Sequence, residues 1–238
     1  MPPFATRQLR FPCGTVTEYH DAAHASDQAT RFLARHLRVA PGSVVVEAGC
    51  GTGVLALLAA RGGAGAVHAT DVDPGALDLL RAAAAAQGLD RIVPHLGSLL
   101  EPLPAGVQAD LVVALLPQKP SPGAFDVRYA GGADGADLLC ALIEQAAGRL
   151  RPGGRLLLYH HSLAAPVRVE RALGRAFLWR TLAERFRLCR RDRYAALAPG
   201  ILATLQRLVA EGVAQAWEQG PHLVWRARVI EACRRSVP

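Results

Sequence analysis

Three glycines at alternate positions, Gly49, Gly51 and Gly53, follow the carboxylate of Glu47 in the stretch EAGCGTG. Glycine lets a backbone turn sharply and approach a ligand closely. A dinucleotide-binding turn spaces its glycines as G-x-G-x-x-G, and here the third glycine comes one residue early. A carboxylate beside the turn would repel a pyrophosphate and favour a cationic ligand. The stretch therefore predicts a cofactor turn of another kind.

Strands and helices alternate around this turn, which is typical of an α/β sheet. A β-branched run over 44–48 predicts the strand before the turn, and 54–61 predicts a helix after it. The next predicted strand, 66–71, ends at Asp71, and Pro74 stands where a first helical turn begins. In an open α/β sheet ligands bind outside the carboxyl ends of the strands. We expect the turn and Asp71 to meet at that edge.

The rest of the chain supplies the remaining elements. Further strands are predicted over 91–96, 109–116, 154–161, 187–193 and 222–233, and helices over 26–37, 136–150, 167–186 and about 199–219. Unbroken apolar strands imply a sheet that is covered on both faces. We expect an α/β fold with a Rossmann-like, doubly wound sheet of about seven strands, the last one antiparallel, and helices on both faces.

Length and composition indicate one domain over residues 1–238. Half of the chain is hydrophobic and a fifth is charged, as in ordinary globular proteins. We expect an N-terminal helical segment over 1–40, with its helix capped by Ser26, and a helical insertion over 194–220 near the substrate side, the two forming a lid. The opening MPPFATRQLRF lacks an apolar leader, and no stretch reads as a membrane span. We expect a cytoplasmic protein that does not contact membranes.

The turn resembles the first motif of class I S-adenosylmethionine (SAM)-dependent methyltransferases, E/D-x-G-x-G-x-G. Glu47, Gly49, Gly51 and Gly53 match each fixed position. In that family the turn packs against the methionyl and ribose parts of SAM. The acid at the end of the second strand accepts hydrogen bonds from both ribose hydroxyls, and Asp71 stands there. The resemblance implies SAM as the cofactor and S-adenosylhomocysteine as its product.

Residues 40–160 resemble most closely the HemK-like protein-glutamine methyltransferases. The GG-x-DG turn in FDVRYAGGADGADLL and the stretch GSLLEPL carry this likeness, although Ser98 replaces the usual adenine-binding Asp. We expect backbone groups and apolar packing to hold the adenine. The further cofactor contacts that the resemblance implies are Cys50, Val72, Ser98, Leu99 and Leu115.

The fourth strand departs from the HemK-like pattern. Those enzymes carry Asn-Pro-Pro-Tyr where this chain has Leu115, Leu116, Pro117 and Gln118. A leucine side chain cannot accept a hydrogen bond from an amide or a base amino group. We therefore expect methylation of a small molecule at nitrogen or oxygen, as in specialised metabolism, and no methylation of a glutamine amide.

Four residues are candidates for acting on the acceptor. Gln118, beside Lys119, could orient a polar group, or it could lie in a solvent-exposed loop. His160 and His161 end the fifth strand, where alternation turns one ring toward the pocket. That ring could take a proton from the acceptor; the better candidate is His160, and the alternative is a partly buried histidine bonded to backbone. Tyr19 precedes the first helix, in a segment that could cover the substrate or form a polar surface loop. No acidic cluster or cysteine pair indicates a metal.

Charge leaves two other classes of function open. The net charge is +7, 14 of the 27 basic residues lie in 168–238, and all but Lys119 are arginine. A basic face can attract nucleic acid, yet we expect solvated helix faces because the arginines are not interleaved with aromatic residues that look exposed. The alternatives are a nucleic-acid or protein methyltransferase that docks through this arginine-rich third, and a non-enzymatic SAM-binding scaffold. We expect a monomer or a homodimer.

Overall fold

The protein, studied as a computed structural model, is described over residues 4–21, 23–121, 123 and 126–235. Its chain forms two compact units. The first unit comprises Met1–Leu115, Gln145–Leu158 and Cys233–Pro238, and the second comprises Leu116–Glu144 and Tyr159–Ala232. No helix in the described ranges is long and apolar enough to cross a membrane.

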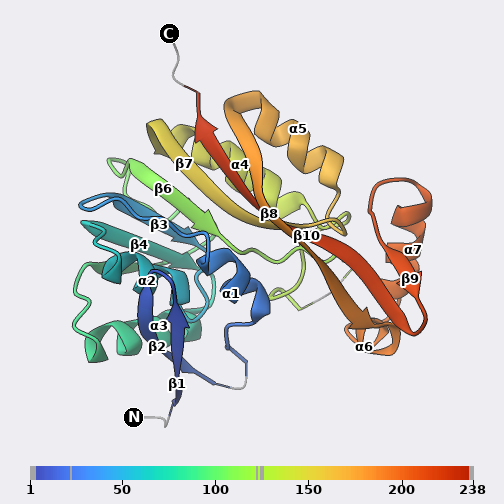
Figure 1. The fold of residues 1–238 in the computed structure, drawn as a ribbon, viewed down its shortest axis with the longest axis horizontal. Helices are drawn as coiled ribbons and strands as arrows, with labels where there is room; N and C mark the ends of the chain where they lie inside the picture. Colours follow the sequence, from blue (N-terminus) through green and yellow to red (C-terminus); the bar gives the residue numbers. More distant parts are fainter. Residues whose placement is uncertain (1–3, 22, 122, 124–125, 236–238) are drawn as a thin grey trace. The chain divides into compact units, whose positions relative to one another are not determined.

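The first unit is built on parallel strands (Figure 1). The strands are β3 (Val44–Ala48), β4 (Ala66–Asp71), β5 (Ile92–Leu96), β6 (Ala109–Ala114) and β7 (Leu150–His161), in the order β5-β4-β3-β6-β7. Helix α2 (Val54–Arg61) follows β3, α3 (Pro74–Ala86) follows β4, and α4 (Asp137–Arg149) precedes β7. The Rossmann-like α/β architecture expected from the sequence is confirmed.

The first 40 residues contain a β-hairpin that the sequence did not reveal. Strands β1 (Ala5–Phe11) and β2 (Gly14–His20) pair antiparallel. Helix α1 (Gln28–Ala34) follows them, and its N-cap is Asp27, whose carboxylate accepts hydrogen bonds from the backbone of Ala29 and Thr30. The expected cap, Ser26, is wrong by one residue, because the Ser26 hydroxyl donates to Glu18 instead.

The second unit begins with the loop after β6 and takes in the end of β7. Its other elements are α5 (Pro166–Ala176), β8 (Phe177–Arg190), α6 (Arg191–Ala195), α7 (Ile201–Ala210), β9 (Trp217–Gln219) and β10 (His222–Arg234). The sheet order runs on as β7-β10-β8, and β9 pairs antiparallel with β10. The antiparallel close of the sheet is as expected.

The helix predicted over 167–186 ends ten residues early. It stops at Ala176, and from Phe177 onward burial alternates along β8 as in a strand with one covered face. The arginines in FLWRTLAERF are compatible with the predicted helix, since arginine favours helices, and the strand predicted over 187–193 begins ten residues earlier than expected. Pairing with β10 overrides that local preference.

Glu18 joins the hairpin to the glycine turn within the first unit. Its carboxylate is fully buried, and it accepts hydrogen bonds from the Thr52 hydroxyl (2.6 Å), the Ser26 backbone (2.6 Å) and Arg7 Nε (2.5 Å). Burial by itself would raise the pKa of this carboxyl, but these donors outweigh it and lower the pKa below the ordinary 4.5. Thr52 belongs to the glycine turn, so one carboxylate joins the hairpin, the start of α1 and the turn.

We predict that Glu18→Gln lowers the free energy of unfolding by about 2 kcal/mol, because hydrogen bonds to a charged acceptor are lost. The matched control is Glu144→Gln, at an exposed position of α4. Because the pKa of Glu18 lies below 4.5 in the folded state, its contribution is complete above pH 4.5 and is lost as the pH falls through the folded pKa. Urea titrations at several pH values measure both effects. Equal urea midpoints for the wild type and Glu18→Gln at pH 7 would contradict this role of Glu18.

Candidate functional site

The glycine turn has the sharp, left-handed backbone that its sequence suggested. Gly51 and Gly53 have φ angles of 50° and 74°, in the left-handed region that favours glycine. A Cβ at Gly53 would collide with the side chain of Leu80 on α3, whereas one at Gly51 would meet no atom within 4 Å. The turn is therefore packed on one side and open on the other. The open side lets a ligand approach the backbone, which fits a bound cofactor.

Asp71 is the point at which three loops of the first unit meet. Its carboxylate accepts hydrogen bonds from the backbone of Gly51 (2.7 Å) and Asp73 (3.0 Å), and its carbonyl accepts one from Gly97 (2.8 Å). The Cys50 backbone donates to the carbonyl of Thr70 (2.9 Å). These bonds fix the carboxylate beside the turn, and each oxygen retains a lone pair for a ribose hydroxyl.

Glu47 has a structural role at the start of α2. Its carboxyl is buried at the end of β3 and accepts a hydrogen bond from the backbone of Ala56 (2.7 Å), in the first turn of α2. The N-cap of α2 is Gly53, which has no side chain to offer. Burial raises the pKa of Glu47 to about 8, and the charge of Asp71 raises it further, against the backbone bonds. Its contact with the cofactor stays a prediction.

The loop after β5 is the third of the loops that meet at Asp71. Leu99 has a φ angle of 49°, and its carbonyl accepts a hydrogen bond from the Thr70 hydroxyl (2.6 Å), which anchors the loop to β4. Val72, next to Asp71, leaves 53% of its surface exposed. An exposed valine beside this acid suits the apolar adenine contact expected from the sequence. The contacts of Ser98 and Leu115 with adenosine stay predictions.

The N-terminal segment also reaches the loop after β4. His24 Nε2 lies 2.8 Å from a carboxylate oxygen of Asp73, and His24 Nδ1 lies 3.0 Å from Asp21. Burial lowers the pKa of His24, but the two carboxylates outweigh it and raise it above 6.5. Tyr19 lies on β2 opposite Thr6, and its part in a lid stays a prediction. Sequence reasoning missed Glu18, because nothing local marks its distant partner Thr52.

Gln118, in the second unit, fixes its own loop. Its amide nitrogen donates to the carbonyls of Tyr159 (2.8 Å) and Leu116 (3.3 Å), and its oxygen accepts from the His161 backbone (3.0 Å). Only 3% of its surface is exposed. Both amide protons are used, so Gln118 has a structural position in this geometry. It does not lie in an exposed loop, and its amide is not left to orient an acceptor.

His160 is held on both sides of its ring. Nε2 lies 2.9 Å from the carbonyl of Ala164, so it carries the proton, and Nδ1 accepts a hydrogen bond from Arg228 (3.1 Å). Burial lowers its pKa to about 4, and the charge of Arg228 lowers it further. No ring nitrogen is left to take a proton from an acceptor. The geometry thus gives no support to His160 as the better candidate base.

His161 differs from its neighbour. Its Nδ1 is buried and has no hydrogen-bond partner within the described part of the chain. The ring packs edge-to-face against Tyr159 and Trp225, with centroids 6.3 and 6.4 Å away. Burial lowers its pKa to about 3, helped by His160 and Lys119. His161 is a neutral imidazole with one unused ring nitrogen.

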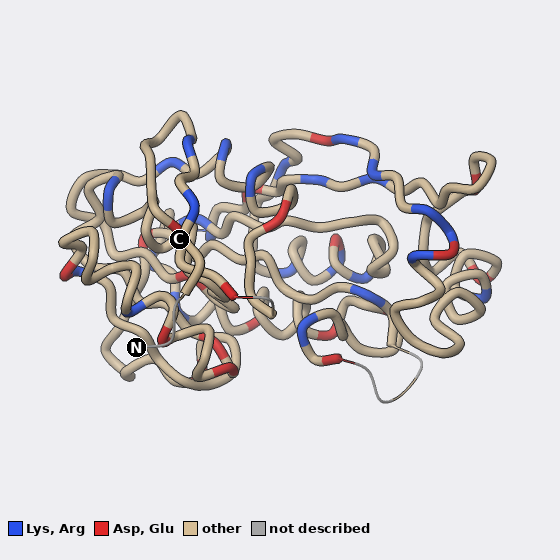
Figure 2. Tube along the Cα trace, turned by 90° about the horizontal axis from the view of Figure 1, so that it is seen from below, with Lys and Arg blue, Asp and Glu red and all other residues tan. Residues whose placement is uncertain are grey.

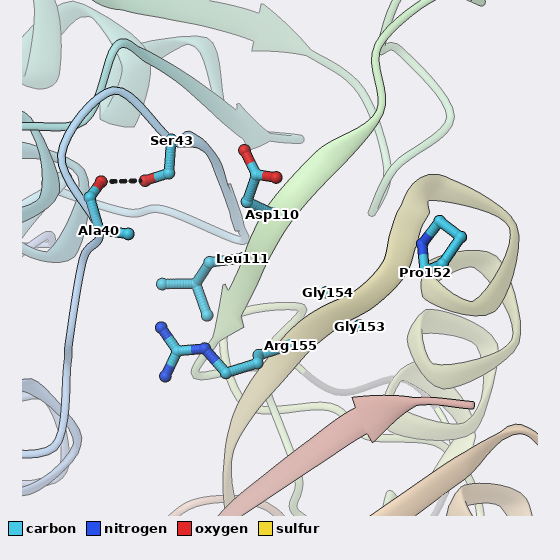
Figure 3. A pocket seen from close by; sticks show the side chains of 8 residues that line it. All are labelled: Ala40, Ser43, Asp110, Leu111, Pro152, Gly153, Gly154 and Arg155. Carbon is cyan, nitrogen blue, oxygen red and sulfur yellow. Dashed lines mark hydrogen bonds between the residues drawn. The ribbon is translucent and has the colours of Figure 1, made fainter. Parts of the chain in front are cut away.

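A separate cavity of about 260 Å³ lies in the first unit (Figure 3). It is lined by Ala40, Ser43, Asp110, Leu111, Pro152, Gly153, Gly154 and Arg155, where β3, β6 and β7 begin. That is the edge opposite the glycine turn. Asp110 already accepts bonds from the Val44 backbone and Arg151, and Arg155 donates to the carbonyl of Arg38. Its place in the sheet separates this cavity from the Asp71 site.

Comparison with known proteins now decides the family. The profile of the methyltransferase small domain matches residues 22–184. The chain belongs to this family. Membership confirms the methyltransferase class and the SAM cofactor that the turn and Asp71 indicated.

Two curated relatives share more than a third of their aligned residues with the chain. The ribosomal protein L11 methyltransferase of Pelotomaculum thermopropionicum is 37% identical over 128 residues, which cover 53% of this chain and 34% of that protein. The release factor glutamine methyltransferase of Moorella thermoacetica is 40% identical over 126 residues, which cover 48% and 44%. The chain thus spans less than half the length of either relative.

A solved structure agrees in fold. The T. thermophilus 16S rRNA N2 G1207 methyltransferase (RsmC), in complex with AdoMet and guanosine, superposes with a TM-score of 0.62 over 98% of this chain and 52% of that one, at 20% identity. At this identity the likeness concerns the fold alone.

These findings correct the expected acceptor. A small-molecule acceptor was predicted because Leu115 replaces the amide-binding Asn, but the relatives just named are methyltransferases of a ribosomal protein and of release factors. The small-molecule prediction is therefore wrong. Loss of one hydrogen-bond acceptor argues against one substrate group, and it carries no information about the size of the molecule that bears the methylated atom.

We predict that Asp71→Ala weakens SAM binding about 30-fold to 1000-fold, because two hydrogen bonds to a carboxylate are lost. Asp78→Ala is the matched control, since Asp78 is an exposed carboxylate on α3 that pairs with Arg81. Calorimetric titration with SAM measures both variants. If Asp71→Ala kept the wild-type dissociation constant, Asp71 would not be the ribose acid.

We predict that His160 makes the free energy of unfolding fall in acid. Because its folded pKa is about 4 and its ordinary value is 6.5, the folded state resists protonation, so its stability falls as the pH drops from 6.5 to 4. The expected loss is roughly 3 kcal/mol. His160→Gln should remove that part of the slope and leave SAM affinity unchanged. Denaturant midpoints between pH 4 and 7.5 test this, and identical slopes in both proteins would rule it out.

Proposed function

We propose that this chain is a SAM-dependent methyltransferase whose acceptor is a macromolecule of the translation apparatus. The observation that carries the proposal is the convergence of the open glycine turn and two further loops on Asp71. About half of this chain is 37% to 40% identical to the two curated translation-related methyltransferases. Such an acceptor would also imply that the protein acts in the cytoplasm.

Methyl transfer depends more on the alignment of the reacting atoms than on reactive side chains. A lone pair of the acceptor attacks the methyl carbon, the carbon–sulfur bond breaks, and sulfur leaves as a neutral thioether. Holding the reacting atoms in line provides much of the acceleration. We assign the cofactor side to Glu47, Gly49, Cys50, Gly51, Gly53, Asp71, Val72, Ser98, Leu99 and Leu115.

Of the two histidines at the end of β7, we favour His161 over His160 as a residue that contacts an acceptor. The unused Nδ1 of His161 can accept a hydrogen bond from an acceptor N–H or O–H. A pKa of about 3 makes it a weak base, so its role would be to orient the group and not to store its proton. The absence of an amide-binding side chain at Leu115 still argues against a glutamine amide as the methylated group.

The proposal is tested with tritiated SAM and separated cellular fractions. These are ribosomal subunits, extracted rRNA, tRNA, ribosomal proteins, release factors and the small-molecule filtrate of the source organism. We expect label in a macromolecular fraction with the wild type and with Asp78→Ala, and none with Asp71→Ala. Label confined to the filtrate would refute a macromolecular acceptor.

A further inference from the structure

An exposed pair of aromatic rings lies on the second unit. Phe186 on β8 and Trp217 on β9 contact each other edge-to-face, with centroids 5.4 Å apart, and they expose 58% and 44% of their surfaces. Leu188, two residues further along β8, is 58% exposed on the same side of the strand. Exposed aromatic residues among the arginines of 168–238 were not expected from the sequence.

The segment that carries Phe186 is rich in arginine. From Phe177 to Ala195 the chain carries six arginines and two acidic residues. Arg190 follows Phe186 and Leu188 on the exposed side of β8, and Arg191 pairs with Glu218, the neighbour of Trp217. Figure 2 shows blue basic and red acidic segments along the whole tube, and the count for Phe177–Ala195 comes from the sequence. We call Phe186, Leu188, Trp217, Arg190 and Arg191 the β8–β9 face.

The acidic partners on this face do not cancel its attraction for an anion. Arg190 pairs with Asp192 at 2.6 Å and Arg191 with Glu218 at 3.6 Å, and all four side chains are between 45% and 61% exposed. Ion pairs this exposed contribute little free energy. A phosphate, which accepts two hydrogen bonds from a guanidinium, can replace the carboxylate.

We propose that the β8–β9 face docks RNA, with unpaired bases stacked on Phe186 and Trp217 and phosphates held by Arg190 and Arg191. The inference rests on the proposed function and names the class of macromolecule. Flat rings beside arginines suit single-stranded RNA, because every base presents a π-face and every linkage a negative charge. The six arginines against two acidic residues over Phe177–Ala195 favour a polyanion over a protein surface.

The test measures the affinity of a fluorescein-labelled 12-nucleotide single-stranded RNA by anisotropy, in the absence of SAM. Phe186→Ala and Trp217→Ala should each weaken binding roughly 5-fold to 100-fold. Leu178→Ala is the matched control, because Leu178 is 65% exposed on the same side of β8. Arg191→Gln should also make binding less sensitive to salt, since each phosphate contact adds to that dependence, whereas Arg81→Gln on α3 should not.

The outcomes are separable. Weaker RNA binding in the aromatic variants, with SAM affinity and circular dichroism unchanged, supports the docking face. Equal RNA affinity in the wild type and both aromatic variants overturns it, as does impaired methylation of isolated ribosomal proteins without any change in RNA binding, which would indicate a protein partner. Failure of the wild type to methylate any macromolecular fraction counts against the proposed function, since RNA binding without SAM does not depend on turnover.

Discussion

The hydrogen bond from the first turn of α2 to the buried carboxyl of Glu47 is the contact on which the cofactor site depends. It satisfies a helix terminus that Gly53 leaves uncapped, and it thereby holds α2 against the end of β3. With both ends of the turn fixed, the Gly51 backbone points at Asp71. Any side chain at 47 that cannot accept this bond would release the turn and, with it, the orientation of the ribose acid.

A second layer of contacts supports the turn from the N-terminal hairpin. Glu18 reaches Thr52 inside the turn, and His24 reaches Asp73 just past Asp71. Glu18 and His24 thus help to fix the positions of the glycine turn and the loop after β4, although neither is assigned to the cofactor. The two contacts respond to pH in opposite directions. The lowered pKa of Glu18 means that its contacts are lost in acid, whereas the raised pKa of His24 means that its contact with Asp73 weakens as the pH rises through that value.

The features that were predictable from the sequence are local ones. The alternating glycines, the acid at the end of β4 and the proline at the start of α3 each follow from the conformational needs of a few neighbouring residues, so fold class and cofactor could be read directly. Strand β8 and the pairing of His160 with Arg228 depend on partners far along the chain. No period or motif announces such partners.

The nature of the acceptor shows the same limit. An absent Asn at position 115 was read as a change of substrate class, whereas the relatives point to macromolecules, and the aromatic pair on β8 and β9 became visible only with the strand in place. Acceptor recognition involves surfaces and not only the atoms near the methyl group.

The central claim, that the β3–α2 turn and Asp71 hold SAM, is tested most directly by a crystal structure of the complex with S-adenosylhomocysteine. We predict both ribose hydroxyls within hydrogen-bonding distance of the Asp71 carboxylate, and the open side of Gly51 covered by the ligand. A nucleoside bound elsewhere, such as in the cavity beside Asp110 and Arg155, with Asp71 still facing solvent, would contradict it.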